Sequence, residues 1–206
     1  MKVIDLSIPF KHSEDVFTKL KPNSPIYCGN ECYAYDIEIK SHHGTYFETS
    51  AHVFRDGQNT DIVPLEQLIL PGMCIIFEED RRCITADDLD NLAGDIKPDS
   101  ALLINTGNDR MKYFSLDAAQ WMAKKEVTLF GSNTSRYDTG FVNPTGFFID
   151  LFKAEISIVA NITNLHLLPR TGFTLIVLPL KISNICTVPC RIIAMLTTNL
   201  IAGNRD

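Results

Sequence analysis

The sequence predicts a mixed α/β fold, in which a mixed sheet or barrel has helices packed on its outside. Strand-like and helix-like segments alternate in the middle of the chain, and strand-like segments cluster at both ends. The chain has 206 residues, of which 45% are hydrophobic and 21% charged, so it can bury the core of a single domain spanning 1–206. The sequence shows no internal repeat, low-complexity tract or domain linker.

The first half of the chain opens with a strand-like segment at 3–8, and we expect the polar stretch 9–25 to form an irregular N-terminal arm. Residues 33–40 alternate apolar and polar side chains, which is typical of a strand with one face in water. Apolar runs at 72–78 and 101–105 predict buried strands. Between them, Thr85 and Asp88 form a near capping box that marks the start of a helix.

In the second half of the chain, strand-like and helix-like segments continue to alternate. Ser115 is the expected N-cap of a helix that runs to residue 125, with an inner face formed by Leu116, Ala119, Trp121 and Met122. A strand is predicted at 127–130, and the apolar segment 141–153 reads as a loop followed by a helix. Three further strands are predicted at 156–159, 173–182 and 191–197.

Charge and composition exclude several classes of partner. The net charge is −6 and there is no block of Lys or Arg, which argues against binding to nucleic acid or to an anionic membrane. No apolar run is long enough to span a bilayer, and the N-terminus lacks the core of an export signal, so we expect a cytoplasmic protein. The six cysteines then read as reduced, small buried hydrophobes, although the pairs Cys28/Cys32 and Cys186/Cys190 leave a zinc site open.

The segment 41–52 is the strongest candidate for a chemical site, because it holds three of the five histidines and a carboxylate. Residues two apart share one face of an extended chain, so His42, Tyr46, Glu48 and His52 would lie together if strand geometry persists. Such a group can bind a metal, transfer protons or form a hydrogen-bond network. Any one of these residues alone is better explained as a satisfied polar group, but the cluster favours a functional site.

This segment resembles the signature of the cyclase family, which includes bacterial kynurenine formamidases and isatin hydrolase. The family pattern His-x-Gly-Thr-His-x-Asp-x-Pro-x-His aligns with 42–52 in the same register. Further similarities follow in order along the chain, at 5–7, 105–107, 161–165, 178–181 and 189–191. The resemblance implies the swivelling β/β/α fold and assembly into homodimers or homotetramers.

The resemblance also implies five metal-ligand positions, and most of them are changed here. His42 keeps the first position, Tyr46 replaces a histidine, and Glu48 replaces a bridging aspartate. The later His and Glu fall on Phe148 and Ala160, which offer no ligand atom. His52 occupies a position that serves proton transfer in the family. We therefore expect no metal cofactor, with a single weakly held divalent ion at His42 and Glu48 left open.

Our leading functional hypothesis is metal-independent acid–base catalysis on a small carbonyl-containing metabolite, as in a biosynthetic tailoring enzyme. The reaction would be a cyclisation, dehydration, isomerisation or ring opening. The expected catalytic residues are Glu48, His52, Tyr46 and His42, and the expected substrate-binding residues are Thr45, His43, Phe47 and Phe148. Two alternatives stay open: a non-catalytic small-molecule-binding protein, and a one-metal amide or lactone hydrolase.

Overall fold

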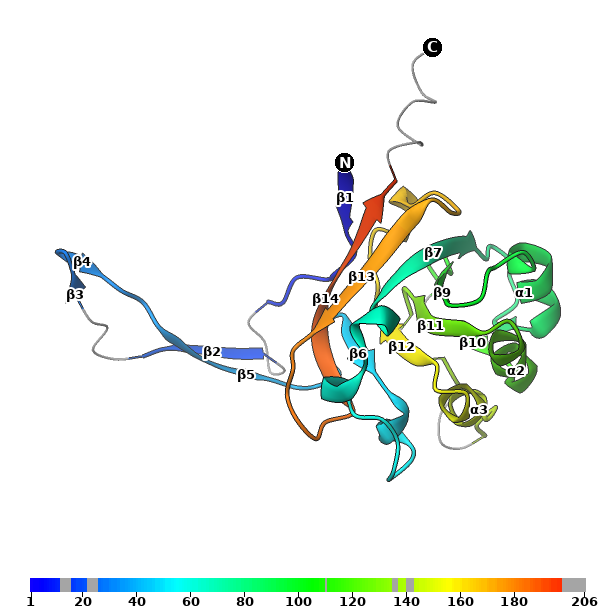
Figure 1. Cartoon of the computed structure of the whole chain (residues 1–206), viewed down its shortest axis with the longest axis horizontal. Coiled ribbons are helices and arrows are strands. Elements are labelled where there is room, and N and C mark those ends of the chain that lie inside the picture. The colour runs from blue at the N-terminus through cyan, green and yellow to red at the C-terminus, as the bar shows by residue number, and fades with distance from the viewer. Residues whose placement is uncertain (12–15, 22–25, 110, 135–136, 140–142, 198–206) are drawn as a thin grey trace, which may run out of the picture.

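The fold is built around a mixed sheet that closes on itself, as shown by a computed structural model (Figure 1). The structure describes residues 1–11, 16–21, 26–109, 111–134, 137–139 and 143–197. The main sheet is formed by β1 (Lys2–Asp5), β6 (Tyr46–Glu48), β7 (Ile69–Ile76), β9 (Ser100–Asn105), β11 (Val127–Ser132), β12 (Ser157–Ala160), β13 (Phe173–Pro179) and β14 (Thr187–Leu196).

The strand order in this sheet is β1-β14-β13-β7-β9-β11-β12-β6, and an additional pairing of β14 with β6 closes it into a barrel. Strands β7, β9, β11 and β12 run parallel to their neighbours within this group, whereas β6, β13, β14 and β1 pair in antiparallel fashion. The prediction of a mixed sheet or barrel is thus confirmed. The closure matters for function because it brings the start of β14 against the short strand β6.

Three helices cover one side of the barrel: α1 (Ala86–Ala93), α2 (Leu116–Lys124) and α3 (Phe147–Lys153). An apolar layer that includes Leu89, Met122 and Leu151 packs these helices against the outer face of the sheet. A second cluster contains alternate strand residues, such as Phe47, Leu103 and Val177, and fills the barrel interior. The helices therefore lie outside the barrel, as the sequence predicts.

The helix starts show one confirmed prediction and two differences. The capping box is present, because the Thr85 side chain accepts from the Asp88 amide and the Asp88 carboxylate accepts from the Thr85 amide. Ser115 precedes α2 but makes no capping hydrogen bond, since its hydroxyl donates to the carbonyl of Ile84. Leu116 was expected on the inner face, but it is 40% exposed because the buried stripe begins at Ala118.

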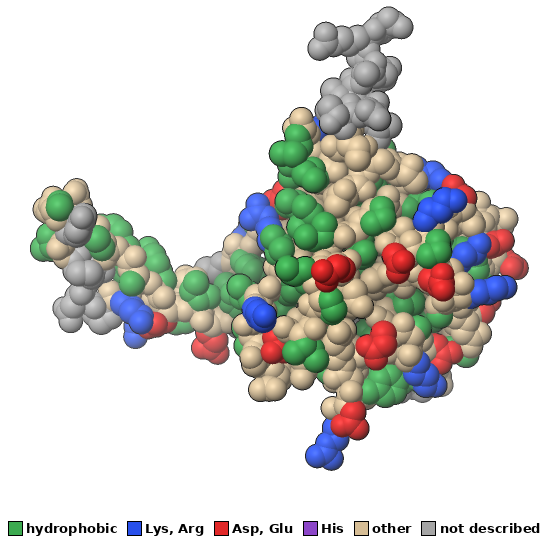
Figure 2. Space-filling view, viewed as in Figure 1, with side chains coloured by type: hydrophobic (Ala, Val, Ile, Leu, Met, Phe, Trp, Pro, Cys, Tyr) green, Lys and Arg blue, Asp and Glu red, His purple; other side chains and the backbone are tan. Residues whose placement is uncertain are grey.

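The N-terminal arm is longer and more regular than the sequence predicts. The strand β2 (Val16–Leu20) lies within the stretch expected to be irregular, and it pairs with β5 (Tyr35–Ile39) in an antiparallel ribbon. Its outer end carries the short strands β3 (Ile26–Tyr27) and β4 (Asn30–Glu31). The ribbon projects away from the barrel (Figure 1), and the space-filling view shows hydrophobic side chains along it (Figure 2).

The remaining regular elements are short. A parallel pair is formed by β8 (Cys83–Ile84) and β10 (Tyr113–Phe114), and four 3-10 turns occur at η1 (Ser50–His52), η2 (Thr60–Ile62), η3 (Leu65–Gln67) and η4 (Leu165–Leu167). Within the described part of the chain, no helix has the length and apolar character needed to cross a membrane.

The expectation that all six cysteines are small buried hydrophobes is wrong for two of them. Cys28 and Cys32 are exposed, because they belong to the projecting arm rather than to the barrel. Cys74 is buried, whereas Cys83, Cys186 and Cys190 are partly exposed, and all six thiols are free.

Candidate functional site

Glu48 forms the centre of the candidate site. It lies on β6 between β12 and β14, opposite Ile158 on one side and Thr187 on the other. Its side chain is only 6% exposed, and its Oε1 atom lies 2.9 Å from Nδ1 of His52 and 3.5 Å from Nε2 of His42. A carboxylate this buried needs polar partners, and the two imidazoles supply them.

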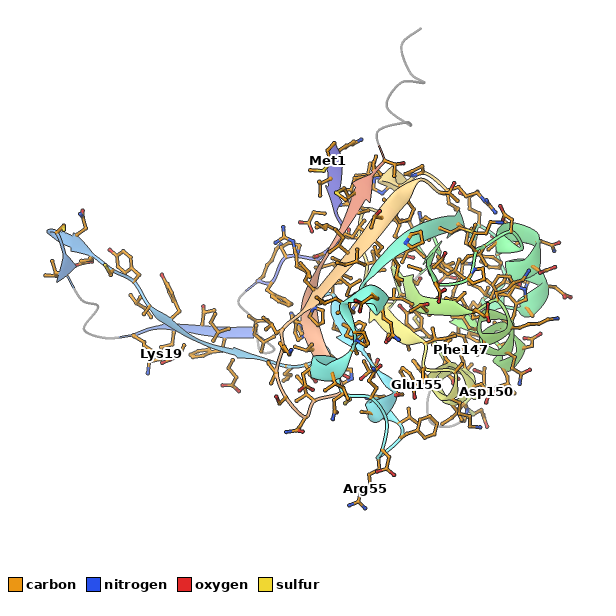
Figure 3. The ribbon with its side chains drawn as sticks, in the orientation of Figure 1. Met1, Lys19, Arg55, Phe147, Asp150 and Glu155 are labelled. Atoms are coloured by element: carbon orange, nitrogen blue, oxygen red, sulfur yellow. The ribbon has the colours of Figure 1, made fainter. Side chains whose placement is uncertain are left out.

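A tight turn after β6 folds His52 back onto Glu48. The turn η1 begins directly after Thr49, and the Ser50 hydroxyl and carbonyl accept hydrogen bonds from the amides of Gln58 and Phe54. Gly57 is required here, because a Cβ at this position would lie 2.5 Å from the Ser50 backbone. Beyond the turn, the loop extends away from the barrel with Arg55 near its tip (Figure 3). The strand geometry expected through His52 therefore ends at Glu48, yet His52 still reaches the carboxylate.

The other edge of the segment is fixed by Gly44 and Asn161. Gly44 has φ +63°, and a Cβ there would collide with the Phe10 ring at 2.3 Å. The Asn161 side-chain amide donates to the Gly44 carbonyl at 2.8 Å, and the Thr45 hydroxyl donates to the Asn161 carbonyl at 2.7 Å. These bonds hold the chain where it turns from His42 into β6.

The two histidine rings form the accessible side of the cluster, whereas the Tyr46 side chain is buried beside them. The His42 ring contacts those of Tyr46 and His52 edge-on, with centroids 5.3 Å apart in each case. Burial, together with the nearby Glu48 carboxylate, raises the pKa of Tyr46, so this side chain remains a neutral phenol at neutral pH. Because the His42 and His52 side chains are 47% and 40% exposed, a small molecule can reach both imidazoles.

Of the predicted substrate-binding residues, none joins the Glu48 cluster directly. The Phe47 side chain is fully buried in the barrel interior, on the opposite face of β6 from Glu48. The Thr45 hydroxyl is used by backbone hydrogen bonds. His43 packs beside Phe10 with ring centroids 5.7 Å apart, and Phe148 packs against the helix layer near Tyr137. We therefore base the proposed site on His42, Tyr46, Glu48 and His52.

The structure adds two residues that the sequence did not indicate. The Sγ atom of Cys186 lies 3.9 Å from Nδ1 of His52, and the Thr187 hydroxyl lies 3.5 Å from Oε1 of Glu48. Both residues reach the site because β14 pairs with β6. Thr187 and Glu48 are 139 residues apart in the sequence. No local pattern around Cys186 points to this neighbour.

Three of these residues could together hold a single metal ion. Within the part of the chain that is described, His42, Glu48 and His52 have ligand atoms that all lie within 4.8 Å of one another, so a single ion fits this donor set. The positions expected to hold a second ion do not fit. Ala160 pairs with Tyr46 across the sheet, both side chains are buried in the apolar layer, and Phe148 packs against that layer.

The hydrogen bond to Glu48 has the largest effect on the pKa of His52. It raises the pKa of His52 from 6.5 to about 9, outweighing partial burial, which lowers it, while the contact with Cys186 adds to the increase. At neutral pH, His52 is therefore an imidazolium paired with the Glu48 carboxylate.

A pH titration tests this pairing. Because the folded-state pKa is raised, the pair stabilises the protein fully below about pH 6.5, and this contribution is lost as the pH rises through about 9. We expect NMR titration of the histidine ring protons to show one transition near pH 9 that falls toward 6.5 in Glu48→Gln. A normal His52 titration in the wild-type protein would show that the pair is not formed.

The chain belongs to the cyclase family: the sequence model described as "Putative cyclase" matches residues 4–139. Among proteins of curated function, none matches the sequence. Several solved structures share the fold. Isatin hydrolase A from Labrenzia aggregata, bound to benzyl benzoate, has a TM-score of 0.79 at 21% identity, covering 95% of this chain and 94% of the other.

Two further structures agree with this fold. Isatin hydrolase A from Ralstonia solanacearum has a TM-score of 0.75 at 17% identity, covering 95% of this chain and 92% of that one. A protein described as a potential metal-dependent hydrolase with cyclase activity has a TM-score of 0.74 at 20% identity, with 94% and 96% covered. At these identities the similarity establishes the shared fold alone, so function must be argued from the site.

Proposed function

We propose that this protein catalyses proton transfer on a small carbonyl-containing metabolite without a metal ion. The observation that carries the proposal is the 2.9 Å contact between Oε1 of Glu48 and Nδ1 of an accessible His52. Cyclisation, dehydration, isomerisation and the opening of a reactive ring all need a positioned acid and base of this kind. The names of the structural neighbours, which include isatin hydrolases, favour a substrate with a ring carbonyl.

In this proposal, His52 donates and accepts the proton, and Glu48 orients the His52 ring and raises its pKa. Glu48 accepts a hydrogen bond from Nδ1 of His52, so the Nε2–H of the imidazolium can donate to a developing oxyanion or a leaving group. The neutral imidazole then takes a proton back at the same nitrogen. Tyr46 keeps its phenolic proton, and the His42 ring contacts both Tyr46 and His52.

A second candidate is a one-metal amide or lactone hydrolase, which is favoured by the convergence of His42, Glu48 and His52. A zinc ion bound by these residues would supply hydroxide at neutral pH by lowering the pKa of bound water. It would have to displace the proton that His52 holds below about pH 9, so zinc would bind more tightly as the pH rises.

The test is turnover of a panel of lactones, cyclic amides and activated carbonyl compounds by chelator-treated protein. We expect the wild-type protein to convert at least one of them and His52→Gln to lose roughly 10²–10⁴-fold in rate. His166→Gln is the matched control, because His166 is exposed on η4 and outside the Glu48 cluster, and it should retain full rate. Equal rates for both variants would contradict the role of His52, and binding without turnover of any compound would favour a non-catalytic binding protein.

A further inference from the structure

The loop that carries His52 is held at both ends by a buried threonine. Thr49 precedes the loop and Thr60 follows it. Between them the chain contains no strand, and it extends away from the barrel with Arg55 near its tip (Figure 3). Because no sheet ladder fixes this loop, the position of His52 depends on how the two ends of the loop are attached to the barrel.

Each of these threonines makes two hydrogen bonds to a single backbone carbonyl. The Thr49 amide and hydroxyl donate to the Cys186 carbonyl at 3.0 and 3.2 Å. The Thr60 amide and hydroxyl donate to the Ile185 carbonyl at 2.9 and 3.1 Å. A carbonyl oxygen has two lone pairs, so each of these oxygens is fully used. The two ends of the loop are therefore attached to successive residues of one short segment.

This segment belongs to the same framework as Glu48. It leads directly into β14, whose first residue, Thr187, pairs with Glu48 on β6. The backbone of His52 is attached to it through Thr49, because the His52 amide donates to the Thr49 carbonyl at 3.0 Å. A continuous series of hydrogen bonds thus runs from the start of β14 to the backbone of the residue whose Nδ1 lies 2.9 Å from Oε1 of Glu48.

We propose that Thr49 and Thr60 are positioning residues, whose hydroxyl groups hold the loop where Nδ1 of His52 meets Glu48. A displacement of about 1 Å in a reacting group can lower the rate roughly 100-fold, so two buried bonds at the base of the loop can matter for turnover. The effect on turnover rests on the proposed function, whereas the geometry of the pair can be measured without any substrate.

The hydroxyl groups restrain the loop more than the two amides could alone. A threonine side chain has few χ1 rotamers, so a hydroxyl bonded to the same oxygen as the amide fixes the side chain and the backbone together. The same pattern occurs at Thr197, where the amide and hydroxyl donate to the Gly172 carbonyl at 3.0 and 2.7 Å. Thr197 follows the opposite end of β14, away from Glu48, and provides a matched control.

The kinetic test compares Val and Ser substitutions. Thr49→Val and Thr60→Val remove the hydroxyl and keep a β-branched side chain of nearly the same shape. We expect kcat to fall roughly 10–100-fold in each while KM changes little, because the substrate still binds when Nδ1 of His52 is displaced from Glu48. Thr49→Ser and Thr60→Ser should restore most of the rate. Thr197→Val loses the same kind of bond outside the loop and should keep the wild-type kcat.

The structural test needs no turnover. In protein with isotope-labelled histidine, NMR at low temperature follows the proton on Nδ1 of His52. A charge-assisted hydrogen bond to Glu48 shifts this resonance downfield and slows its exchange with water. We expect the resonance in the wild-type protein, in Thr197→Val and in both Ser variants, and we expect it to shift upfield or disappear in both Val variants.

The two measurements separate this inference from the proposed function. If no compound is converted, the proposed function fails, but the NMR comparison still tests the positioning role. An unchanged Nδ1 resonance in both Val variants overturns the proposal, as does an equal loss of kcat in Thr197→Val or a loss that Ser does not restore. Circular dichroism checks that the variants fold. If Thr49→Val does not fold, Thr60→Val provides the same test at the other end of the loop.

Discussion

Replacing Glu48 by Gln should greatly lower turnover while leaving ligand binding largely intact. Gln keeps nearly the same shape, but it cannot carry the charge that keeps the imidazole of His52 protonated at neutral pH. We expect a loss of roughly 10²–10⁴-fold in kcat, with little change in the affinity for an inert substrate analogue. The measurement is steady-state kinetics together with calorimetric titration of the analogue.

The pH profile separates a chemical role of Glu48 from a structural one. If Glu48 acts through His52, any residual activity of Glu48→Gln should depend on a His52 group that titrates near 6.5 rather than near 9. Thr187→Val removes a different polar neighbour of Glu48 and serves as a control, because it leaves the pair with His52 in place. Unchanged turnover in Glu48→Gln would rule out the proposed mechanism.

Replacing Ala160 by Glu should strongly destabilise the protein. Ala160 is 1% exposed and pairs across the sheet with the buried Tyr46, so a carboxylate would enter a packed apolar layer. An uncompensated buried charge costs on the order of 3–5 kcal/mol in the free energy of unfolding. Denaturant unfolding of the purified variant measures this loss.

Ala154→Glu is the matched control. Ala154 is exposed at the end of α3, so the same substitution should change the free energy of unfolding by no more than about 0.5 kcal/mol. If Ala160→Glu were as stable as the wild-type protein, the space beside Tyr46 would be polar and open. It could then hold a second ion, contrary to the packing argued above.

The local features of the fold could be predicted from the sequence, whereas the long-range ones could not. The capping box of Thr85 and Asp88 and the alternation of 33–40, which contains β5, are visible because each pattern lies within a few residues. The strand β2 was missed because its sequence, Val-Phe-Thr-Lys-Leu, is short and lies in a polar stretch. The strand β2 forms because it pairs with β5, and this pairing cannot be seen in the residues of β2 alone.

In the candidate site, too, the local features could be predicted from the sequence and the long-range contacts could not. His42, Tyr46, Glu48 and His52 were indicated by their spacing, and the structure brings them together even though strand geometry ends at Glu48. Cys186 could not be found in this way, because its contact with His52 depends on closure of the barrel by β14 and β6. Phe47 was expected to bind substrate, but its position next to Glu48 in sequence places it on the opposite face of the strand.

The most direct test of metal-independent catalysis is a calorimetric titration of zinc into chelator-treated protein at pH 7, with turnover measured on the same samples. We expect turnover to persist after chelation and to remain unchanged as zinc is added, because His52 holds a proton where an ion would need a lone pair. Tight binding of one zinc per chain, with turnover that appears only when the ion is bound, would contradict the proposed function and support the one-metal hydrolase.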